Sequence, residues 1–271
     1  MIELLDDLSR TIRLEAPARR IVSLVPSITE TLFALGAGEC IAGITDYCIH
    51  PEDQVGAKPK VGGTKNFSVS RILELKPDLV VANAEENRKH QVDTLEDAGL
   101  RVFVTFPKSV DGCLKMIADA AALTGTSEAA QGILASIYKS RIDARARSSD
   151  PPARVLCPVW KDPYMTINGD TFVDNVIRSC GGRNIFADSP ERYPKFSLAE
   201  AACGQPDIVL LPTEPYHFTE VDIPGIEEMG DAVPACRNHR IYIVEGELLS
   251  WYGPRLARAL SEISILIASC R

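Results

Sequence analysis

Short apolar runs and amphipathic segments alternate along the chain in a repeating order. The run IVSLV is broken by Pro26, and Ser27 is placed to cap a helix that ends at Gly36. A helix around VSRILEL, the apolar run DLVVANA, a polar helix from Asn87 to Ala98 and the apolar run RVFVTF follow in turn. Strands that are apolar on both faces and alternate with helices predict a parallel sheet covered on both sides.

The same order begins again at Arg154. The runs VLCPVW, DIVLLP and RIYIVEG predict strands, and helices are expected from Thr171 to Cys180, near Ala199 and from Pro254. The chain is therefore predicted to be an α/β protein with two Rossmann-like lobes of three layers each.

The segment between the two halves, residues 111–152, lacks strand signals. Its first helix ends at Gly125, and a second helix is predicted from Ser127 to about Arg147. About 21 helical residues would span about 31 Å, so we expect a single rigid helix between an N-terminal lobe of residues 1–110 and a C-terminal lobe of residues 153–271. One face of this helix is expected to be buried through Ala130, Ile133, Leu134, Ile137 and Tyr138.

The composition is that of an ordinary globular protein, and the charge argues against a nucleic-acid partner. Of 271 residues, 45% are hydrophobic, and 29 basic residues stand against 37 acidic ones for a net charge of −8. The basic residues are spread along the chain, so we expect no nucleic-acid binding. Because no apolar run approaches the length of about 18 residues that a membrane span needs, we also expect no membrane insertion.

The first fifteen residues and the cysteines both indicate the cytosol. MIELLDDLSRTIRLE carries charges through the window where a secretory signal needs an apolar core. The eight cysteines form no CxxC pair and several lie in apolar runs, which is typical of reduced, buried thiols. We therefore expect a cytoplasmic protein without disulfides, or a periplasmic one if Met1 replaces a removed signal peptide.

The chemistry is expected in the loops at the carboxyl ends of the strands. Open parallel sheets bind ligands at that edge, and two lobes that face each other would form a ligand cleft. DYCIHP, GGTKNF, AEEN, VWKDPYM, TEPYHF and EGELLSWYG hold both tryptophans and two of the four histidines, which favours a large, partly aromatic ligand. The residues expected to contact it are Cys48, His50, Thr64, Lys65, Asn66, Glu85, Glu86, Trp160, Lys161, Tyr164, Glu214, Tyr216, His217, Glu247, Trp251 and Tyr252.

Cys48 and His50 have two interpretations. In an extended segment they point to the same side and could both reach one ligand. Alternatively, Cys48 is buried under the loop and His50 bonds to the backbone. If a metal is bound directly, His217 and Glu247 from the other lobe would complete a set suited to zinc or iron. Further carboxylates are Glu85, Glu86 and Glu214, although the run AEEN fits a helix cap equally well.

The aromatic and the basic side chains of these loops have different expected roles. We expect Trp251 in the cleft, because Gly253 and Pro254 break the chain beside it, and we expect Trp160 to pack between its lobe and the long helix. Side chains that could pair with carboxylates or phosphates of a ligand are Lys65, Lys161 and Arg255.

Enzyme motifs are mostly absent. LGAGECIAG fails as a dinucleotide fingerprint because its third glycine position is Ile41, and the chain has no GxxxxGK[ST], HExxH or GxSxG. The alternative to a binding protein is a metal-dependent or thiol enzyme that uses Cys48 and His50. A binding protein is favoured over it, because adjacent side chains on one strand rarely provide an oriented base and an oxyanion hole.

Five stretches resemble one family. They are RIVSLVPSITETLFALG, SVSRILELKPDLVVAN, PYMTING with TFVDNVIRSCGGRNIF, QPDIVLLP and the late WYGPR, and together they span nearly the whole chain in the family's order. They resemble the class III substrate-binding proteins of ABC importers, also called helical-backbone metal receptors, which bind cobalamin, haem or iron siderophores. The resemblance implies two lobes joined by one long helix, and a receptor for a corrinoid, haem or iron chelate.

The chain looks closest to a signal-less branch of that family. Exported members carry on each lobe a glutamate that docks onto the membrane permease, and the corresponding positions here are Ser70 and Ala199, with Glu200 one residue away. The resemblance therefore implies a retained small-molecule cleft in a cytosolic receptor that does not dock onto an ABC permease.

Overall fold

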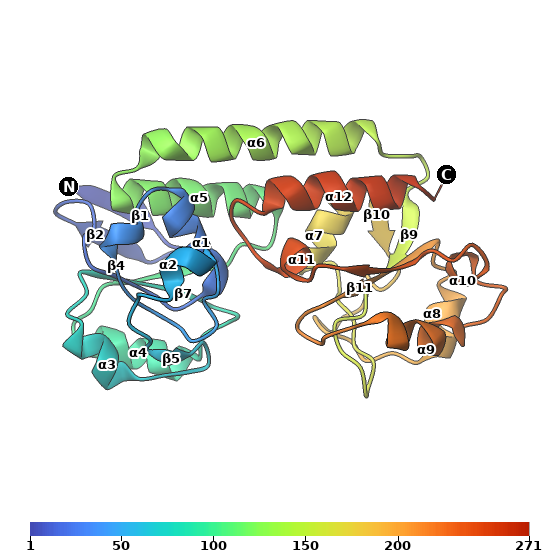
Figure 1. Cartoon of the computed structure of the whole chain (residues 1–271), viewed down its shortest axis with the longest axis horizontal. Coiled ribbons are helices and arrows are strands. Elements are labelled where there is room, and N and C mark those ends of the chain that lie inside the picture. The colour runs from blue at the N-terminus through green and yellow to red at the C-terminus, as the bar shows by residue number, and fades with distance from the viewer. Residues whose placement is uncertain (271) are drawn as a thin grey trace. The chain divides into compact units, whose positions relative to one another are not determined.

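The computed structural model describes residues 1–270 and divides into two compact units (Figure 1). Unit 1 comprises Met1–Pro107, Asp111–Ala135 and Tyr252–Pro254, and unit 2 comprises Lys108–Val110, Ser136–Trp251 and the chain from Arg255 on. Each unit contains one four-stranded parallel sheet, which confirms the two predicted α/β lobes. Among the helices of the described chain, none has the length and apolar character that a membrane crossing requires.

The sheet of unit 1 has the strand order β4-β3-β7-β8. Its strands are β3 (Ile21–Ser23), β4 (Ile41–Ile44), β7 (Leu79–Asn83) and β8 (Val102–Thr105), and its helices are α1 (Pro26–Ala34), α3 (Val69–Glu74), α4 (Lys89–Asp97) and α5 (Val110–Thr124). Shorter elements are η1 (Gly38–Cys40), α2 (Glu52–Val55), β5 (Gly62–Gly63) and β6 (Asn66–Phe67). The sequence did not predict β4, where Gly43 interrupts the apolar run. A Cβ at Gly43 would lie 2.5 Å from Leu75 Cδ1, so a larger residue there would displace the Leu75 side chain.

Alternate side chains of these strands face opposite layers of unit 1. Leu79 and Phe103 line a small apolar cavity together with residues of α1 and α5. Val80 lies in a separate core cluster with Ile72 of α3 and Leu95 of α4. Helices therefore cover both faces of the sheet, which explains why its strands are apolar throughout.

The sheet of unit 2 has the strand order β10-β9-β11-β12. Its strands are β9 (Ala153–Leu156), β10 (Gly182–Asn184), β11 (Ile208–Pro212) and β12 (Ile241–Val244), and its helices are α7 (Phe172–Ser179), α8 (Leu198–Cys203), α9 (Ile223–Glu227), α10 (Pro234–Arg237), α11 (Glu247–Ser250) and α12 (Leu256–Ala268), with the short η2 (Glu220–Asp222). Val209 and Leu211 pack with Ile226 of α9 on one face. On the other face, a Cβ at Gly182 would lie 2.8 Å from Ile177 Cγ2 of α7.

The long helix α6 (Ser127–Ala146) has 20 residues, close to the predicted span. It begins in unit 1 and continues in unit 2 from Ser136, so the expected middle segment of residues 111–152 is divided between the units. Ile137 is fully buried, but Tyr138, expected on the same face, is 51% exposed. One residue rotates the side chain by about 100° around the helix axis, which carries Tyr138 off the buried stripe.

Helix α1 begins one residue before the expected cap. Pro26 is its first residue and Val25 its N-cap, which makes no side-chain hydrogen bond, while Ser27 is buried inside the helix. Proline at the first position has no N–H that needs a cap, so the predicted Ser27 cap is not required. Gly36 follows the helix with φ +76, as the sequence predicts.

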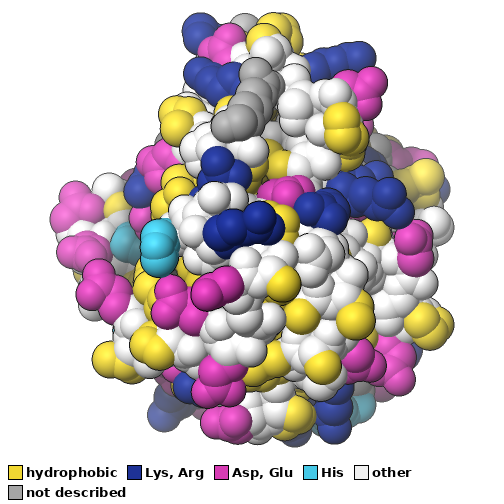
Figure 2. Space-filling view, turned by 90° about the vertical axis from the view of Figure 1, so that its right-hand side faces the viewer, with side chains coloured by type: hydrophobic (Ala, Val, Ile, Leu, Met, Phe, Trp, Pro, Cys, Tyr) yellow, Lys and Arg dark blue, Asp and Glu magenta, His cyan; other side chains and the backbone are white. Residues whose placement is uncertain are grey.

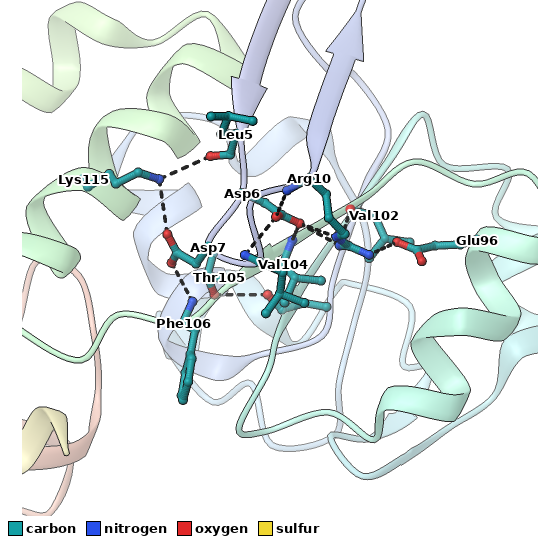
Figure 3. A network of polar contacts seen from close by, with 12 residues as sticks. Leu5, Asp6, Asp7, Arg10, Glu96, Val102, Val104, Thr105, Phe106 and Lys115 are labelled. Atoms are coloured by element: carbon teal, nitrogen blue, oxygen red, sulfur yellow. Dashed lines mark hydrogen bonds and ion pairs between the residues drawn. The ribbon is translucent and has the colours of Figure 1, made fainter. Parts of the chain in front are cut away.

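The first fifteen residues form a hairpin that the sequence analysis did not predict. Strand β1 (Ile2–Leu5) pairs antiparallel with β2 (Thr11–Leu14). The turn between them binds the outer edge of β8: Val104 N donates to Asp6 Oδ2 at 3.3 Å, and Asp7 N donates to Val104 O at 3.0 Å (Figure 3). The Asp6 carboxylate and the backbone of Asp7 therefore cover the edge strand β8, which has no further strand beside it in the four-stranded sheet.

Candidate ligand-binding loops

Aromatic side chains gather at the carboxyl ends of β9 and β11 in unit 2. Trp160 follows β9, is 43% exposed, and lies edge-on to Tyr216, which follows β11; the ring centroids are 5.9 Å apart. Tyr216 in turn packs on the fully buried Phe218, with centroids 4.6 Å apart. The core thus fixes Tyr216, and Tyr216 braces the exposed indole. We call Trp160 and Tyr216 the aromatic pair.

A tight turn presents Trp160 and Tyr164. Met165 N donates to Trp160 O at 3.0 Å, which closes the turn over residues 160–165. Tyr164 stacks on Phe196 with centroids 5.5 Å apart and an interplanar angle of 27°, and burial raises the pKa of its hydroxyl. The half-buried Tyr164 therefore supports the turn from the side of the core.

Lys161, in the same turn, is already paired. Its Nζ lies 2.7 Å from Asp222 Oδ1. The hydrogen bond between them lowers the pKa of Asp222 and raises the pKa of Lys161. The positive charge that the sequence analysis assigned to a ligand is thus largely neutralised within unit 2.

The structure reverses the expected roles of the two tryptophans. Trp251 is 9% exposed and Tyr252 5%, whereas Trp160 is the exposed one. Trp251 is the C-cap of helix α11; its N–H donates to Glu247 O at 3.0 Å, and the Arg255 guanidinium carbon lies 5.4 Å from the centroid of its ring. This helical turn directs Trp251 into the protein, so the prediction that Trp251 lies in an exposed loop is wrong.

The carboxylates of Glu214 and Glu247 are also engaged inside unit 2. Ser250 Oγ donates to Glu214 Oε1 at 2.5 Å, and burial raises the pKa of Glu214. Glu247 Oε2 lies 2.9 Å from Arg255 Nη1, and Glu245 Oε1 lies 3.0 Å from the same nitrogen. Arg255, expected to meet a ligand carboxylate or phosphate, is therefore paired with two protein carboxylates.

His217 is exposed in the loop after β11. Its Nδ1 lies 3.1 Å from Thr213 O, at the carboxyl end of that strand. The structure therefore places this expected ligand-binding residue at the edge of the sheet where the aromatic pair also lies.

In unit 1, Cys48 does not face outward. It is 1% exposed, and its Sγ lies 3.1 Å from Thr29 Oγ1 and 3.2 Å from Thr45 Oγ1. The interpretation of Cys48 as a residue buried under the loop is confirmed, and its assignment as a thiolate donor at a cleft entrance is wrong. The thiol is held inward by the hydroxyl of Thr29, which lies far from Cys48 in the sequence, and by the hydroxyl of Thr45, three residues before it.

The residues on either side of Cys48 are the exposed ones. Tyr47 is 62% exposed and Ile49 50%, while His50 is half-buried. A Cβ at Gly63 would lie 3.2 Å from Tyr47 Cε2, so the tyrosine ring approaches the GGTKNF turn. The sequence analysis did not select Tyr47 or Ile49, although alternation about a buried cysteine would have indicated them.

Buried amides anchor the GGTKNF and AEEN loops. Asn87 Nδ2 donates to Thr64 O at 2.8 Å, and Asn87 Oδ1 accepts from Asn83 N at 2.8 Å. Asn83 Oδ1 accepts the backbone N–H groups of both Glu85 and Glu86, at 2.8 and 3.2 Å. The sequence analysis missed Asn83, and these bonds explain the run AEEN as a loop fixed to the end of β7.

Of the unit 1 residues expected to contact ligand, Lys65 and Asn66 are exposed. Lys65 Nζ donates to Glu85 O at 3.2 Å, and Thr64 is 9% exposed. Within residues 1–270 the structure places no three His, Cys, Asp or Glu side chains together as a metal site. Of the expected set, Cys48 and His50 belong to unit 1, and His217 and Glu247 belong to unit 2.

Comparison with known proteins identifies a family and several proteins that this chain resembles. The family model described as periplasmic binding protein matches residues 21–248. The vitamin B12-binding protein of Vibrio vulnificus (strain CMCP6) is 27% identical over 259 residues, covering 94% of this chain and 92% of that protein. The structure of the periplasmic vitamin B12 binding protein BtuF of Vibrio cholerae superposes with a TM-score of 0.82 at 23% identity, over 94% of this chain and 98% of that one. The periplasmic heme-binding protein RhuT from Roseiflexus sp. RS-1 gives 0.79 at 25% identity, over 93% and 99%.

These relatives correct the expected location. The cytoplasmic assignment is contradicted, because the matching family and the similar solved structures are of periplasmic proteins. The expectation used the charged first fifteen residues, and those residues belong to the folded hairpin on β8, so their charges reflect the fold and not the compartment. The match over residues 21–248 shows that the chain belongs to the periplasmic binding protein family, as a substrate-binding protein of the class III type.

Proposed function

We propose that the chain is a periplasmic receptor that binds a corrinoid and catalyses no reaction. The observation that carries the proposal is the aromatic pair: an indole that is 43% exposed, held edge-on by a tyrosine at the carboxyl edge of a parallel sheet. Exposed aromatic faces of this kind stack on flat, largely apolar rings. The names of the curated relatives, which are vitamin B12-binding proteins, support the same ligand class.

The charges around the aromatic pair favour a corrinoid over haem or an anionic iron chelate. Haem carries two propionates and many iron chelates are anionic, whereas the corrin periphery is rich in neutral amides. Lys161 is paired with Asp222 at 2.7 Å, and Arg255 is paired with Glu247 at 2.9 Å. A ligand carboxylate would have to compete with these protein carboxylates, while amides can use the loop backbone for hydrogen bonds.

The surface charge is consistent with a small-molecule ligand. On the face shown in Figure 2, Lys and Arg side chains lie among Asp and Glu side chains, and hydrophobic side chains occur singly or in small groups. The net charge is −8. This face therefore shows no broad positive patch of the kind that nucleic acids need.

Loops of unit 1 offer further candidate contacts for the ligand. Tyr47 and Ile49 offer exposed apolar surface, and Lys65 and Asn66 offer polar contacts from the neighbouring turn. The buried amide of Asn87 holds that turn through Thr64 O. We therefore add Tyr47 and Ile49 to the ligand-contacting residues and remove Cys48.

A thiol enzyme has less support than a receptor. Cys48 Sγ is buried between two hydroxyls, so the nucleophile that such an enzyme needs is not accessible to a substrate. The family to which the chain belongs consists of binding proteins. We therefore propose a receptor without catalytic residues.

Under this proposal a membrane permease can be a partner of the receptor. It would not dock at the two positions that the resemblance identified. Ser70 and Ala199 are exposed and carry no carboxylate, and Glu200 turns back to accept Ser197 N at 2.7 Å in a capping box. The comparisons give no support to the earlier expectation that no permease is engaged, since the family is that of periplasmic binding proteins. Any docking would use other residues.

The proposal is tested by titrating the purified protein with cyanocobalamin, haemin and a ferric siderophore while following tryptophan fluorescence. Trp160 is the more exposed of the two tryptophans, so a stacked corrinoid should quench its emission. We expect saturable binding of cyanocobalamin that is tighter than binding of either other ligand. Absence of binding to all three, or turnover of a thiol-reactive ester, would contradict the proposal.

A further inference from the structure

The exposed imidazole of His217 is oriented by the backbone. Its Nδ1 lies 3.1 Å from Thr213 O. A carbonyl oxygen only accepts, so Nδ1 must carry the proton of this hydrogen bond. In the neutral ring the lone pair then resides on Nε2, the other nitrogen, on an exposed side chain. Histidines that bind metals commonly have this arrangement, in which one nitrogen donates to a carbonyl and the other binds the metal.

The anchor of this imidazole is rigid. Thr213 N donates to Val244 O at 3.0 Å, and Thr213 Oγ1 accepts from Gly246 N at 2.9 Å. These bonds tie the end of β11 to the end of β12. On the other side of β11 lies β9, whose following turn carries Trp160. His217 therefore stands over the central strand edge, between the loop of Trp160 and the loop that begins at Glu245.

The chain does not complete a metal site around His217. Among residues 1–270 no three His, Cys, Asp or Glu side chains come together for a metal. One imidazole can still serve a metal that brings its other ligands with it, as a metal bound in a macrocycle does. Such a metal needs a single axial donor from the protein.

We propose that His217 Nε2 is an axial ligand of the metal in the bound macrocycle. The inference rests on the proposed function and specifies the ligand further. The receptor would favour a corrinoid whose cobalt has an axial position open to the protein, either because the nucleotide base is missing or because it has left the metal. The aromatic pair would contact the ring, and His217 would bind its metal.

The test uses diaquacobinamide, a corrinoid without its nucleotide base, and follows the visible absorption bands of the corrin. Replacement of water by an imidazole nitrogen on cobalt shifts these bands. We expect the shift with the unaltered protein and with His90→Ala and His239→Ala, which remove other exposed histidines. With His217→Ala the shift should be lost, affinity should fall at least about tenfold, and free imidazole should restore the shift.

The outcomes separate this inference from the proposed function. If His217→Ala binds diaquacobinamide with the same bands and affinity as the unaltered protein, the axial role is wrong and the receptor proposal stands. If the unaltered protein binds neither diaquacobinamide nor cyanocobalamin, both are wrong. A thermal unfolding curve of His217→Ala that matches the unaltered protein shows that the loss of the shift does not come from misfolding.

Discussion

The rings of Trp160 and Tyr216 pack in a T-shaped arrangement, with the centroids 5.9 Å apart and the ring planes inclined at 72°. This geometry leaves much of the indole in solvent while its position is fixed from below by a residue that itself packs on the core. An exposed but braced aromatic face loses little side-chain entropy when it binds a ring, so it provides affinity efficiently.

Asp222 is expected to exclude anionic ligands by neutralising Lys161. In Asp222→Asn the lysine would lose its partner at 2.7 Å, and the ratio of haemin affinity to cyanocobalamin affinity should rise about three- to tenfold, because a propionate could then pair with Lys161. Competition titrations with the two ligands measure this ratio. The matched control is Asp222→Asn with Lys161→Gln, in which the gain should disappear; a gain that persists there would show that Lys161 is not its source.

Glu214 should make stability fall as pH rises. Burial raises its pKa above the ordinary value of 4.5, and the nearby Glu247 adds to the rise, while hydrogen bonds from Ser250 and Trp251 oppose it. Above pH 4.5 the unfolded chain releases this proton before the folded protein does, so the folded state is progressively disfavoured until its own carboxyl ionises. Glu214→Gln should therefore gain stability relative to the unaltered protein between about pH 4 and about pH 7. Urea unfolding at both pH values measures the difference, and a difference that does not change with pH would exclude this role.

The hairpin on β8 should contribute strongly to stability through Asp6. Its fully buried carboxylate accepts hydrogen bonds from Val104 N and from Arg10 Nη2, the latter at 2.7 Å (Figure 3). Asp6→Ala leaves the guanidinium without this partner and should lower the free energy of unfolding by about 3 kcal/mol. Glu3→Ala, on the same hairpin, removes an exposed pair with Arg13 and should change little. Equal urea midpoints for the two variants would refute this account of the edge.

The thiols should differ sharply in reactivity. Burial raises the pKa of Cys113, Cys157 and Cys180 to about 12 each, whereas Cys203 is exposed on α8. Since the thiolate is the reactive form, iodoacetamide should label Cys203 first in the native protein and the other three only after unfolding. Peptide mass spectrometry follows the order of labelling. Labelling of Cys113 in the native protein at the rate of Cys203 would show that the core around it is open.

The two sheets could be predicted from the sequence, because the local pattern of apolar residues in most of their strands agrees with how those strands pack. The runs that became β7, β8, β11 and β12 are apolar on both faces, and each is followed by a turn or helix signal. The elements that were missed have weak local signals. Strand β4 contains Gly43, and the hairpin β1–β2 is held to the sheet by charged side chains that local pattern cannot assign to a partner.

The site was only partly predictable, because the direction of a loop side chain depends on partners far along the chain. Cys48 points inward because its thiol makes a hydrogen bond with Thr29, nineteen residues earlier, inside the core. Trp251 is buried where it caps the short helix α11, and Trp160 is exposed beside Tyr216, which lies fifty-six residues later in the sequence. The loops themselves were predictable, since they follow the carboxyl ends of the strands.

Isothermal titration calorimetry of cyanocobalamin binding to Trp160→Ala tests the central claim most directly. Removal of an exposed, braced indole from the ligand face should weaken binding by about ten- to a hundredfold relative to the unaltered protein. Tyr138→Ala, which removes a 51% exposed aromatic ring from helix α6, is the matched control and should bind as the unaltered protein does. Equal affinity of Trp160→Ala and Tyr138→Ala for cyanocobalamin would contradict the assignment of the aromatic pair as the corrinoid-binding surface.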